Sequence, residues 1–275
     1  MSHYPLEISP DVELLRDVPY GAVAGRKLLL DLALPKKRDP GAPLPSFVYM
    51  HGGAWESGSK ADGVPAVCYY AAHGFAAASI DYRLSGEAQF PAALEDCKCA
   101  VRFLRAHAGE YGIDPRRIGA MGASSGGHLA AMVGLTPAGK FEGDGGWGGF
   151  SSAVCAVCDL FGVHDFLRMP AKPGQRESSA AVRFLGGTPE RYIEASPLNH
   201  VHTAAPPFLF IHGDSDPVVP LQQSELMHKA LKKAGARSAL HVVKGAAHGS
   251  RNVITPEVRE VILGFLRENI ACASS

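Results

Sequence analysis

Short runs of apolar residues alternate with longer segments of helical periodicity along most of this chain, and this alternation limits the folds that it can adopt. Most of the inner runs are almost wholly apolar, as strands are when helices cover both faces of a sheet. We expect strands at Arg26–Leu34, Ser46–Met50, Phe75–Asp81, Arg117–Met121, Ala153–Cys158, Phe208–His212 and Ala239–Lys244. We expect helices at Pro91–His107, Ser125–Leu135, Leu221–Ala234 and Pro256–Asn269. This order predicts an α/β fold with a mostly parallel, doubly wound sheet and helices on both faces.

The length of the chain favours one domain. A chain of 275 residues can bury a full core in one α/β unit but is too short for two large domains. The strand pattern breaks at 161–200, where prolines separate short helical pieces: Pro170, Pro173, Pro189 and Pro197. Because this segment lies between two expected strands, we interpret residues 1–275 as a single domain with a cap or lid insertion at about 161–200.

The charged residues do not indicate a nucleic-acid or membrane partner. Lys plus Arg equals Asp plus Glu at 27 each, so there is no excess of basic residues to attract a polyanion. The first residues lack the pattern of a signal peptide, and no apolar run is long enough to span a bilayer. We therefore expect a cytoplasmic protein without nucleic-acid binding or membrane insertion.

Two of the six cysteines form a Cys-x-x-Cys pair, Cys155 and Cys158, which can signal redox or metal chemistry. The second pair that a zinc site needs is absent, and the residues around this pair have the composition of a buried strand. We interpret both as buried free thiols, and we expect neither a metal ion nor another cofactor.

The segment Gly122–Gly126 reads Gly-Ala-Ser-Ser-Gly, a Gly-x-Ser-x-Gly element between an expected strand and an expected helix. A serine at such a turn takes strained backbone angles, and the flanking glycines remove side chains that would clash there. The turn exposes the serine oxygen beside the first amides of the helix. We interpret Ser124 as a nucleophile rather than part of a small-residue loop, and a nucleophilic serine needs a base and an orienting acid.

The acid is expected in the loop that follows the strand Phe208–His212, because loops at the carboxyl ends of parallel strands collect catalytic groups. This loop contains two aspartates, Asp214 and Asp216. Asp214 follows Gly213 and can instead cap the turn through hydrogen bonds to the backbone. We favour Asp216 as the acid.

The base is expected in the loop after the last strand, which carries His248 between two glycines, Gly245 and Gly249. The chain has 12 histidines, so position rather than residue type selects this one. The order Ser124, Asp216, His248 is the order of nucleophile, acid and base in hydrolases with a strand–turn–helix nucleophile.

A place for the negative oxygen of a tetrahedral intermediate is expected at His51-Gly-Gly-Ala-Trp55, directly after the strand Ser46–Met50. Two successive glycines let backbone amides turn toward the reacting carbonyl. We expect an oxyanion hole made by Gly52, Gly53 and the amide of Ser125, with the Ala54 amide as an alternative donor. A plain glycine turn is the simpler interpretation, but the position of the motif favours the catalytic one.

With these elements in place, further motifs match a known group of proteins: Asp81-Tyr-Arg-Leu84, Phe90-Pro-Ala92, Tyr111–Gly119 and Ser196-Pro197. The chain resembles the α/β-hydrolase superfamily from about residue 26 to 270. The resemblance is strongest to the carboxylesterase and lipase branch with a His-Gly-Gly-x-Trp oxyanion motif, which includes hormone-sensitive-lipase-like and feruloyl-esterase-like enzymes. It implies the same nucleophile, acid, base and oxyanion hole. The sequence departs from the lipase-like pattern at Ala54, where that pattern has glycine, and at Ser125, where alanine is common.

We therefore expect a serine esterase that cleaves a small-molecule carboxylic ester, with short- to medium-chain acyl or aryl groups, through an acyl-enzyme. Three aromatic residues are candidate substrate contacts, although packing of the cap would explain them equally well: Trp55, Phe161 and Phe166. An arylformamidase resembling kynurenine formamidase shares the oxyanion motif and is the main alternative. A peptidase resembling prolyl oligopeptidases and a non-catalytic binding protein are further alternatives. The last strand and the last helix are the candidate interface of a homodimer.

Overall fold

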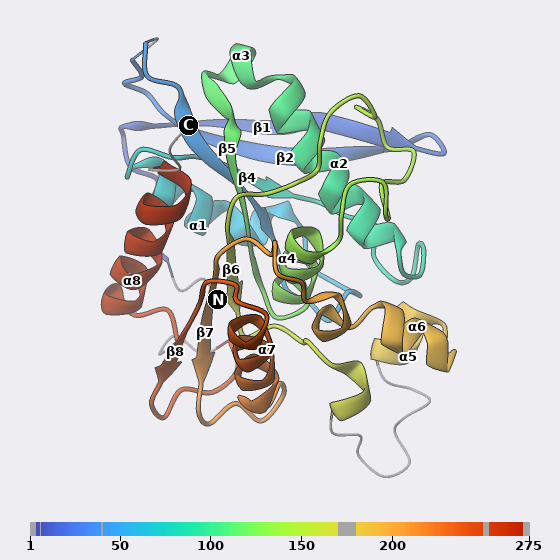
Figure 1. Ribbon diagram of the computed structural model, residues 1–275. Coiled ribbons are helices and arrows are strands. Elements are labelled where there is room, and N and C mark those ends of the chain that lie inside the picture. The colour runs from blue at the N-terminus through green and yellow to red at the C-terminus, as the bar shows by residue number, and fades with distance from the viewer. Residues whose placement is uncertain (1–3, 6, 40, 170–179, 250–252, 272–275) are drawn as a thin grey trace.

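The computed structural model describes residues 4–5, 7–39, 41–169, 180–249 and 253–271, and it shows one twisted eight-stranded sheet (Figure 1). The strands are β1 (Val12–Val23), β2 (Arg26–Pro35), β3 (Leu44–Met50), β4 (Ala76–Ile80), β5 (Ile113–Ala123), β6 (Val157–Leu160), β7 (Phe208–Gly213) and β8 (Ser238–Val243). Their order across the sheet is β1-β2-β4-β3-β5-β6-β7-β8. All neighbours from β4 to β8 pair in parallel, and only β2 runs against its neighbours. The predicted mostly parallel α/β sheet is confirmed.

Helices cover both faces of this sheet. The longer ones are α1 (Lys60–Ala71), α2 (Ala92–Ala106), α4 (Ser125–Leu135), α7 (Gln222–Lys233) and α8 (Pro256–Leu266). The helices α1 and α8 pack on one face, and α2, α4 and α7 pack on the other (Figure 1). A short helix α3 (Ala108–Tyr111) leads into β5, and a π-helical turn, η3 (Arg267–Ala271), follows α8.

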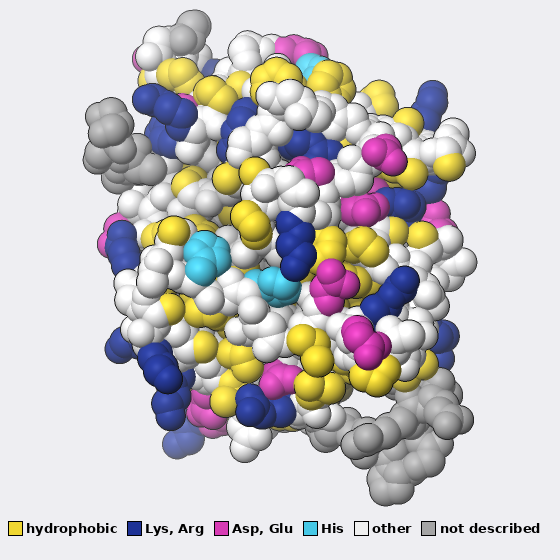
Figure 2. Space-filling model, turned by 45° about the vertical axis from the view of Figure 1, so that its right-hand side comes forward, with side chains coloured by type: hydrophobic (Ala, Val, Ile, Leu, Met, Phe, Trp, Pro, Cys, Tyr) yellow, Lys and Arg dark blue, Asp and Glu magenta, His cyan; other side chains and the backbone are white. Residues whose placement is uncertain are grey.

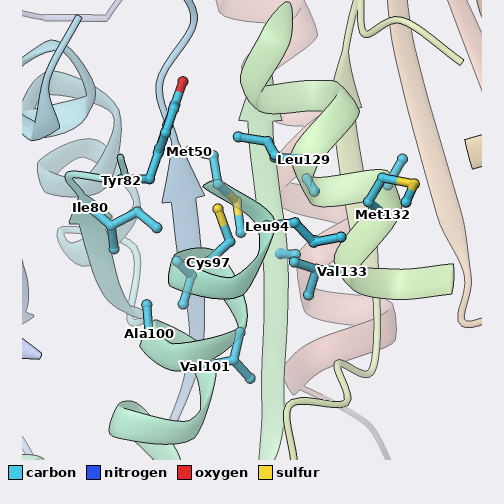
Figure 3. Packing of buried hydrophobic residues seen from close by; sticks show 14 of the residues in the cluster. Met50, Ile80, Tyr82, Leu94, Cys97, Ala100, Val101, Leu129, Met132 and Val133 are labelled. Carbon is cyan, nitrogen blue, oxygen red and sulfur yellow. The ribbon is translucent and has the colours of Figure 1, made fainter. Parts of the chain in front are cut away.

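The core between α2, α4 and the sheet fixes the strand ends that carry the functional loops. Figure 3 shows this packing, with Met50 of β3 beside Leu94 and Cys97 of α2, and with Leu129 of α4 nearby. Each of these side chains is fully buried. Since Met50 is the last residue before the glycine loop and Leu129 lies in the helix that follows Ser124, one core holds both loops in register.

Two expectations about the elements need correction. The strand expected at Ala153–Cys158 begins at Val157 and extends to Leu160, so it contains the buried Asp159. The apolar run before Asp159 pointed to an earlier strand, because a carboxylate is not expected inside a buried strand. A buried carboxylate needs hydrogen bonds, and here the amide of Gly162 donates to Asp159. Helix α1 has no counterpart among the expected helices. Its capping box between Ser59 and Asp62 is a sequence signal that would have found it.

The candidate cap is only partly described. Its elements are η1 (Phe166–Arg168), α5 (Ala180–Leu185), α6 (Pro189–Glu194) and η2 (Pro197–His200), while Pro170 and Pro173 lie outside the described residues. Gln223 of α7 fastens the start of this segment, because its Oε1 accepts the amides of His164 and Asp165 at 2.8 and 2.7 Å. The division into one domain with an insertion stays a prediction.

The surface and the sheet edges bear on the expected partners. On the face drawn in Figure 2, basic side chains are interspersed with acidic ones rather than gathered in one field. No helix in the described ranges is long and apolar enough to cross a membrane. Strand β8 lies at one edge of the sheet, and Val242 on it is exposed. A homodimer through this edge stays a prediction.

A buried ionic cluster ties α2 to the segment that follows α4. Lys98 is fully buried and donates Nζ–H bonds to the carbonyls of Thr136, Pro137 and Lys140 and to the carboxylate of Glu142. The guanidinium of the buried Arg102 donates to the same carboxylate. Burial lowers the pKa of Lys98, while the Glu142 carboxylate raises it in part.

Replacing Glu142 with alanine is expected to reduce the free energy of unfolding by about 3 kcal/mol, because it leaves two buried cations without their anion. Urea denaturation would measure the loss. Glu95→Ala is the matched control, since both glutamate side chains are 26% exposed and the partner of Glu95, Arg83, keeps Asp96. We expect the control to lose less than about 1 kcal/mol. Equal losses in the two variants would contradict this account of the cluster.

Candidate active site

The serine turn has the backbone geometry that its sequence predicts. Ser124 has φ of 54° and ψ of −118°, a conformation that L-residues rarely adopt, and its amide donates to the carbonyl of Leu160 at 2.8 Å. A Cβ atom on Gly122 would lie 2.1 Å from the carbonyl oxygen of Gly126, and one on Gly126 would lie 2.1 Å from the carbonyl oxygen of Met50. The two glycines are therefore required by close backbone contacts, which hold the strained serine between β5 and α4.

Three side chains from the ends of β5, β7 and β8 meet at this turn. The Oγ–H of Ser124 donates to Nε2 of His248 at 2.9 Å, and Nδ1–H of His248 donates to Oδ2 of Asp216 at 2.6 Å. The carboxylate of Asp216 is almost completely buried, whereas the imidazole remains partly open. The structure thus brings together the residues proposed as nucleophile, base and acid, in the hydrogen-bonding order that acyl transfer needs.

The environment of Asp216 keeps it charged. Burial by itself raises the pKa of this carboxyl, but hydrogen bonds from His212, His248 and the amides of Val218 and Val219 outweigh it, so the pKa falls well below its usual range. The two amides donate to Oδ1 at 2.8 and 2.9 Å. Oδ2 is left for the histidines, so the carboxylate is both ionised and fixed in orientation.

Asp214 caps the turn, which is the alternative role that the sequence suggested for it. Its Oδ1 accepts the amide of Gly245 at 2.6 Å and the hydroxyl of Ser215 at 3.1 Å. The bond from Gly245 joins the loop after β7 to the loop after β8, which carries His248, and the bond from Ser215 lies within the first loop. Asp214 therefore shapes the turn and makes no hydrogen bond to His248 in the described structure.

The glycine loop approaches the serine closely. A Cβ on Gly52 would lie 3.0 Å from the carbonyl oxygen of Ala123 and 3.5 Å from Cβ of Ser124. Gly53 has φ of +125°, and Ala54 and Trp55 follow with φ of 54° and 60°. Three successive residues at positive φ cannot continue the strand, so their amides do not take the alternating directions of strand amides. The first amides of α4, that of Ser125 among them, have no acceptor within the helix, so the helix start offers N–H donors beside the serine.

Two residues that the sequence analysis did not assign hold this loop. The hydroxyl of Tyr82 donates to the carbonyl of His51 at 2.8 Å, and its ring stacks on the His51 imidazole with centroids 4.3 Å apart. Nδ1–H of His51 donates in turn to the carbonyl of Gly52 at 2.7 Å. Burial lowers the pKa of His51, which favours the neutral ring. Tyr82 lies in the Asp81-Tyr-Arg-Leu84 motif, and that motif was the signal for it.

The three candidate substrate contacts are buried. Trp55 and Phe166 are each 5% exposed and pack with their ring centroids 5.4 Å apart, and Trp55 also stacks on Phe184 at 4.7 Å. Phe161 packs edge-on against the His248 imidazole at 5.0 Å. The contacts of Trp55 and Phe166 are therefore those of the cap-packing alternative, and Phe161 packs against the histidine expected to be the base. Their roles toward substrate stay predictions.

The Cys-x-x-Cys pair lies away from these groups. Cys158 is buried in β6, and Cys155 is half-buried with its thiol directed at the carbonyl of Ile118 at 3.3 Å. Both are free thiols, and burial raises the pKa of Cys155 to about 11. The part of the chain that the structure describes holds no group of three or more His, Cys, Asp or Glu side chains that could bind a metal ion.

Comparison with known proteins places the chain in a family. Residues 30–231 match the family model described as BD-FAE. The chain belongs to the BD-FAE family of α/β-hydrolases. This match spans the glycine loop, the serine turn and the loop of Asp216. The resemblance inferred from the sequence, to feruloyl-esterase-like α/β-hydrolases, is confirmed.

Relatives of this BD-FAE protein carry the names of esterases. It is 32% identical to the esterase LipQ of Mycobacterium tuberculosis over 84% of its own length and 56% of that protein, and 34% identical to the esterase LipC of the same organism over 78% and 55%. The chain therefore spans about half the length of these curated relatives.

Solved structures cover the BD-FAE chain more completely. A truncated carbohydrate esterase from gut microbiota superposes with a TM-score of 0.86 at 30% identity, over 94% of this chain and 96% of the other. An esterase of Thermogutta terrifontis superposes with a TM-score of 0.81 at 31% identity, over 97% and 96%. That esterase has also been solved after phosphorylation by paraoxon.

Proposed function

We propose that this protein is a serine esterase in which Ser124 is the nucleophile, His248 the base and Asp216 the acid. The observation that carries the proposal is the continuous line of hydrogen bonds from Oγ of Ser124 through the imidazole to a buried carboxylate. The strained turn at Ser124 and the glycine loop beside it supply the two other parts that acyl transfer needs. The family and the esterase names of its relatives support the same chemistry.

In the proposed reaction, Oγ of Ser124 attacks the ester carbonyl while Nε2 of His248 takes the hydroxyl proton. The carbonyl oxygen becomes negative and is bound by amides of Gly52, Gly53 and Ser125 in the oxyanion hole. The same histidine gives its proton to the leaving alcohol, and the acyl group remains on Ser124. Water deprotonated by His248 then attacks the acyl-enzyme. As the bond between the acyl carbon and Oγ breaks, His248 returns the proton to Oγ of Ser124 and the carboxylic acid leaves.

Each group has a reason to act in this way. The charged Asp216 accepts the Nδ1–H bond, so it fixes the tautomer that leaves Nε2 free to take a proton, and it stabilises the imidazolium that forms. The backbone amides of the proposed oxyanion hole bind the negative oxygen, and each such donor typically lowers the barrier by about 3 to 4 kcal/mol. No part of this cycle needs a metal ion or an organic cofactor.

For the substrate, we propose short- to medium-chain acyl or aryl esters. The aromatic side chains next to the glycine loop are packed against one another, with Trp55 and Phe166 each 5% exposed. This packing fills space that a long acyl chain would need beside the oxyanion hole. We therefore expect kcat/KM to fall as the acyl chain lengthens.

The test combines active-site labelling with a substrate panel. A fluorophosphonate probe should add its mass to the peptide that contains Ser124 and to no other serine peptide, because only an activated serine reacts. Rates on p-nitrophenyl esters from acetate to palmitate should then be highest for the short chains. An unlabelled protein without ester hydrolysis would contradict the proposal, and faster cleavage of N-formylkynurenine than of every ester would instead support the arylformamidase alternative.

A further inference from the structure

One buried histidine close to the proposed nucleophile has no part in the reaction as described. His128 lies four residues after Ser124 in α4, and its amide donates to the carbonyl of Ser124 at 3.0 Å. Its side chain is fully buried and uses both ring nitrogens. The Nε1–H of Trp55 donates to Nδ1 at 3.2 Å, and Nε2 lies 2.8 Å from the carbonyl oxygen of Ala195.

The partners fix the protonation of this ring. An indole N–H is only a donor and a carbonyl oxygen is only an acceptor, so Nδ1 must be bare and Nε2 must carry the proton. A second proton on Nδ1 would face the Trp55 N–H and break that bond. Burial lowers the pKa of His128 to about 4, which agrees with a neutral ring at physiological pH.

The two hydrogen bonds join three parts of the site. Trp55 ends the strained glycine loop, Ala195 lies between the cap elements α6 and η2, and His128 belongs to the helix that begins at the nucleophile. Phe184 of α5 stacks on the face of the Trp55 indole, with centroids 4.7 Å apart, and its ring also contacts His128 edge-on. The loop residues at positive φ need such external support, because their backbone conformation is unfavourable by itself.

We propose that His128 is a positioning residue that fixes the glycine loop and the cap against the nucleophile helix, through one hydrogen bond to each. The proposal rests on the proposed function of Ser124 and of the amides of Gly52 and Gly53. It follows that the hydrogen bonds of His128, beyond the volume of its side chain, set the distance between the oxyanion donors and the serine.

Two substitutions separate hydrogen bonding from packing. His128→Gln keeps an acceptor and an N–H donor, whereas His128→Leu keeps volume and loses both. We expect His128→Leu to lower kcat on a short p-nitrophenyl ester by about 10- to 100-fold with KM changed less than about threefold, since the donors would be misplaced in the transition state. We expect His128→Gln to retain kcat within about threefold.

His200→Leu is the matched control, because its Nε2–H also donates to a carbonyl at the end of α6, that of Glu194 at 2.7 Å, without reaching Trp55. We expect the control to keep kcat within about threefold. The proposal is overturned if His128→Leu keeps the full kcat, if His128→Gln loses as much as His128→Leu, or if the control loses as much as either.

A second readout needs no substrate. The chain has two tryptophans, so Trp147→Phe leaves Trp55 as the reporter. In that background we expect His128→Leu to shift the emission of Trp55 and His128→Gln to leave it close to that of the parent. An unshifted His128→Leu would contradict the proposal even if no ester were hydrolysed, so this readout is independent of the proposed function.

If His128→Leu does not fold, Trp55→Phe tests the same bond from its other end, because it removes the indole N–H and keeps α4 intact. We expect it to lower kcat by about tenfold or more with little change in KM. Full activity of Trp55→Phe would overturn the proposal.

Discussion

Replacing Ser124 with alanine is expected to lower kcat for ester hydrolysis by about 10⁶-fold, because no acyl-enzyme can form without the hydroxyl. The geometry supports so large an effect. Oγ of Ser124 donates to a histidine that is itself held by a buried carboxylate, and the strained turn has no second hydroxyl at that position. Steady-state kinetics on p-nitrophenyl acetate would measure the loss, and circular dichroism would show that the fold is kept.

The neighbouring serine is the matched control. Ser125→Ala removes a buried hydroxyl one residue away but keeps the backbone amide assigned to the oxyanion hole. We expect it to keep kcat within about tenfold, since it removes no reacting group. A Ser124→Ala variant with more than about 1% of the parent kcat would exclude Ser124 as the nucleophile, because removing a nucleophilic serine leaves only a small residual rate.

Replacing Asp216 with asparagine is expected to lower kcat by about 10⁴-fold while the fold persists. An amide cannot supply the negative charge that stabilises the imidazolium, and its NH₂ group can turn toward His248 and favour the wrong tautomer. The loss should be present throughout the neutral and mildly acidic range. Hydrogen bonds hold the pKa of Asp216 well below its usual range, so protonation of the acid in the parent enzyme does not reproduce the variant there.

Asp214→Asn is the control for this variant. Asp214 lies two residues away in the same loop and accepts hydrogen bonds from Gly245 and Ser215, which an asparagine carbonyl can also accept. We expect its kcat to stay within about tenfold of the parent. If the two aspartate variants lost activity equally, or Asp214→Asn lost more, the assignment of the acid would be wrong.

The sequence predicted the parts of this molecule that depend on local pattern. Apolar runs indicated most strands to within a few residues, since a strand covered on both faces has few other compositions available. The strand predicted around Cys155 was placed too early in the chain, because the buried Asp159 interrupts the apolar pattern within β6. The candidate residues Ser124, Asp216 and His248 could be proposed because glycine-rich turns after strands are conspicuous in any sequence.

The residues missed by sequence reasoning share a physical cause. His128 and Tyr82 form hydrogen bonds with residues 73 and 31 positions away along the chain, Trp55 and His51. Nothing in the spacing of such pairs marks them, because the contact exists only after α4 and the glycine loop are packed on the same sheet. For the same reason, the sequence could not show whether Trp55 and Phe166 contact substrate or pack against the cap.

The sequence by itself determined the α/β fold, the glycines that the serine turn requires and the chain order of the residues proposed as nucleophile, acid and base. Tertiary structure alone decided that Asp216 rather than Asp214 bonds to His248, and that the aromatic residues of the glycine loop and cap pack together. The difference follows from how far apart along the chain the interacting residues lie. Backbone sterics and periodicity act over a few neighbouring residues, whereas hydrogen-bond partners and burial depend on which segments the folded sheet brings side by side.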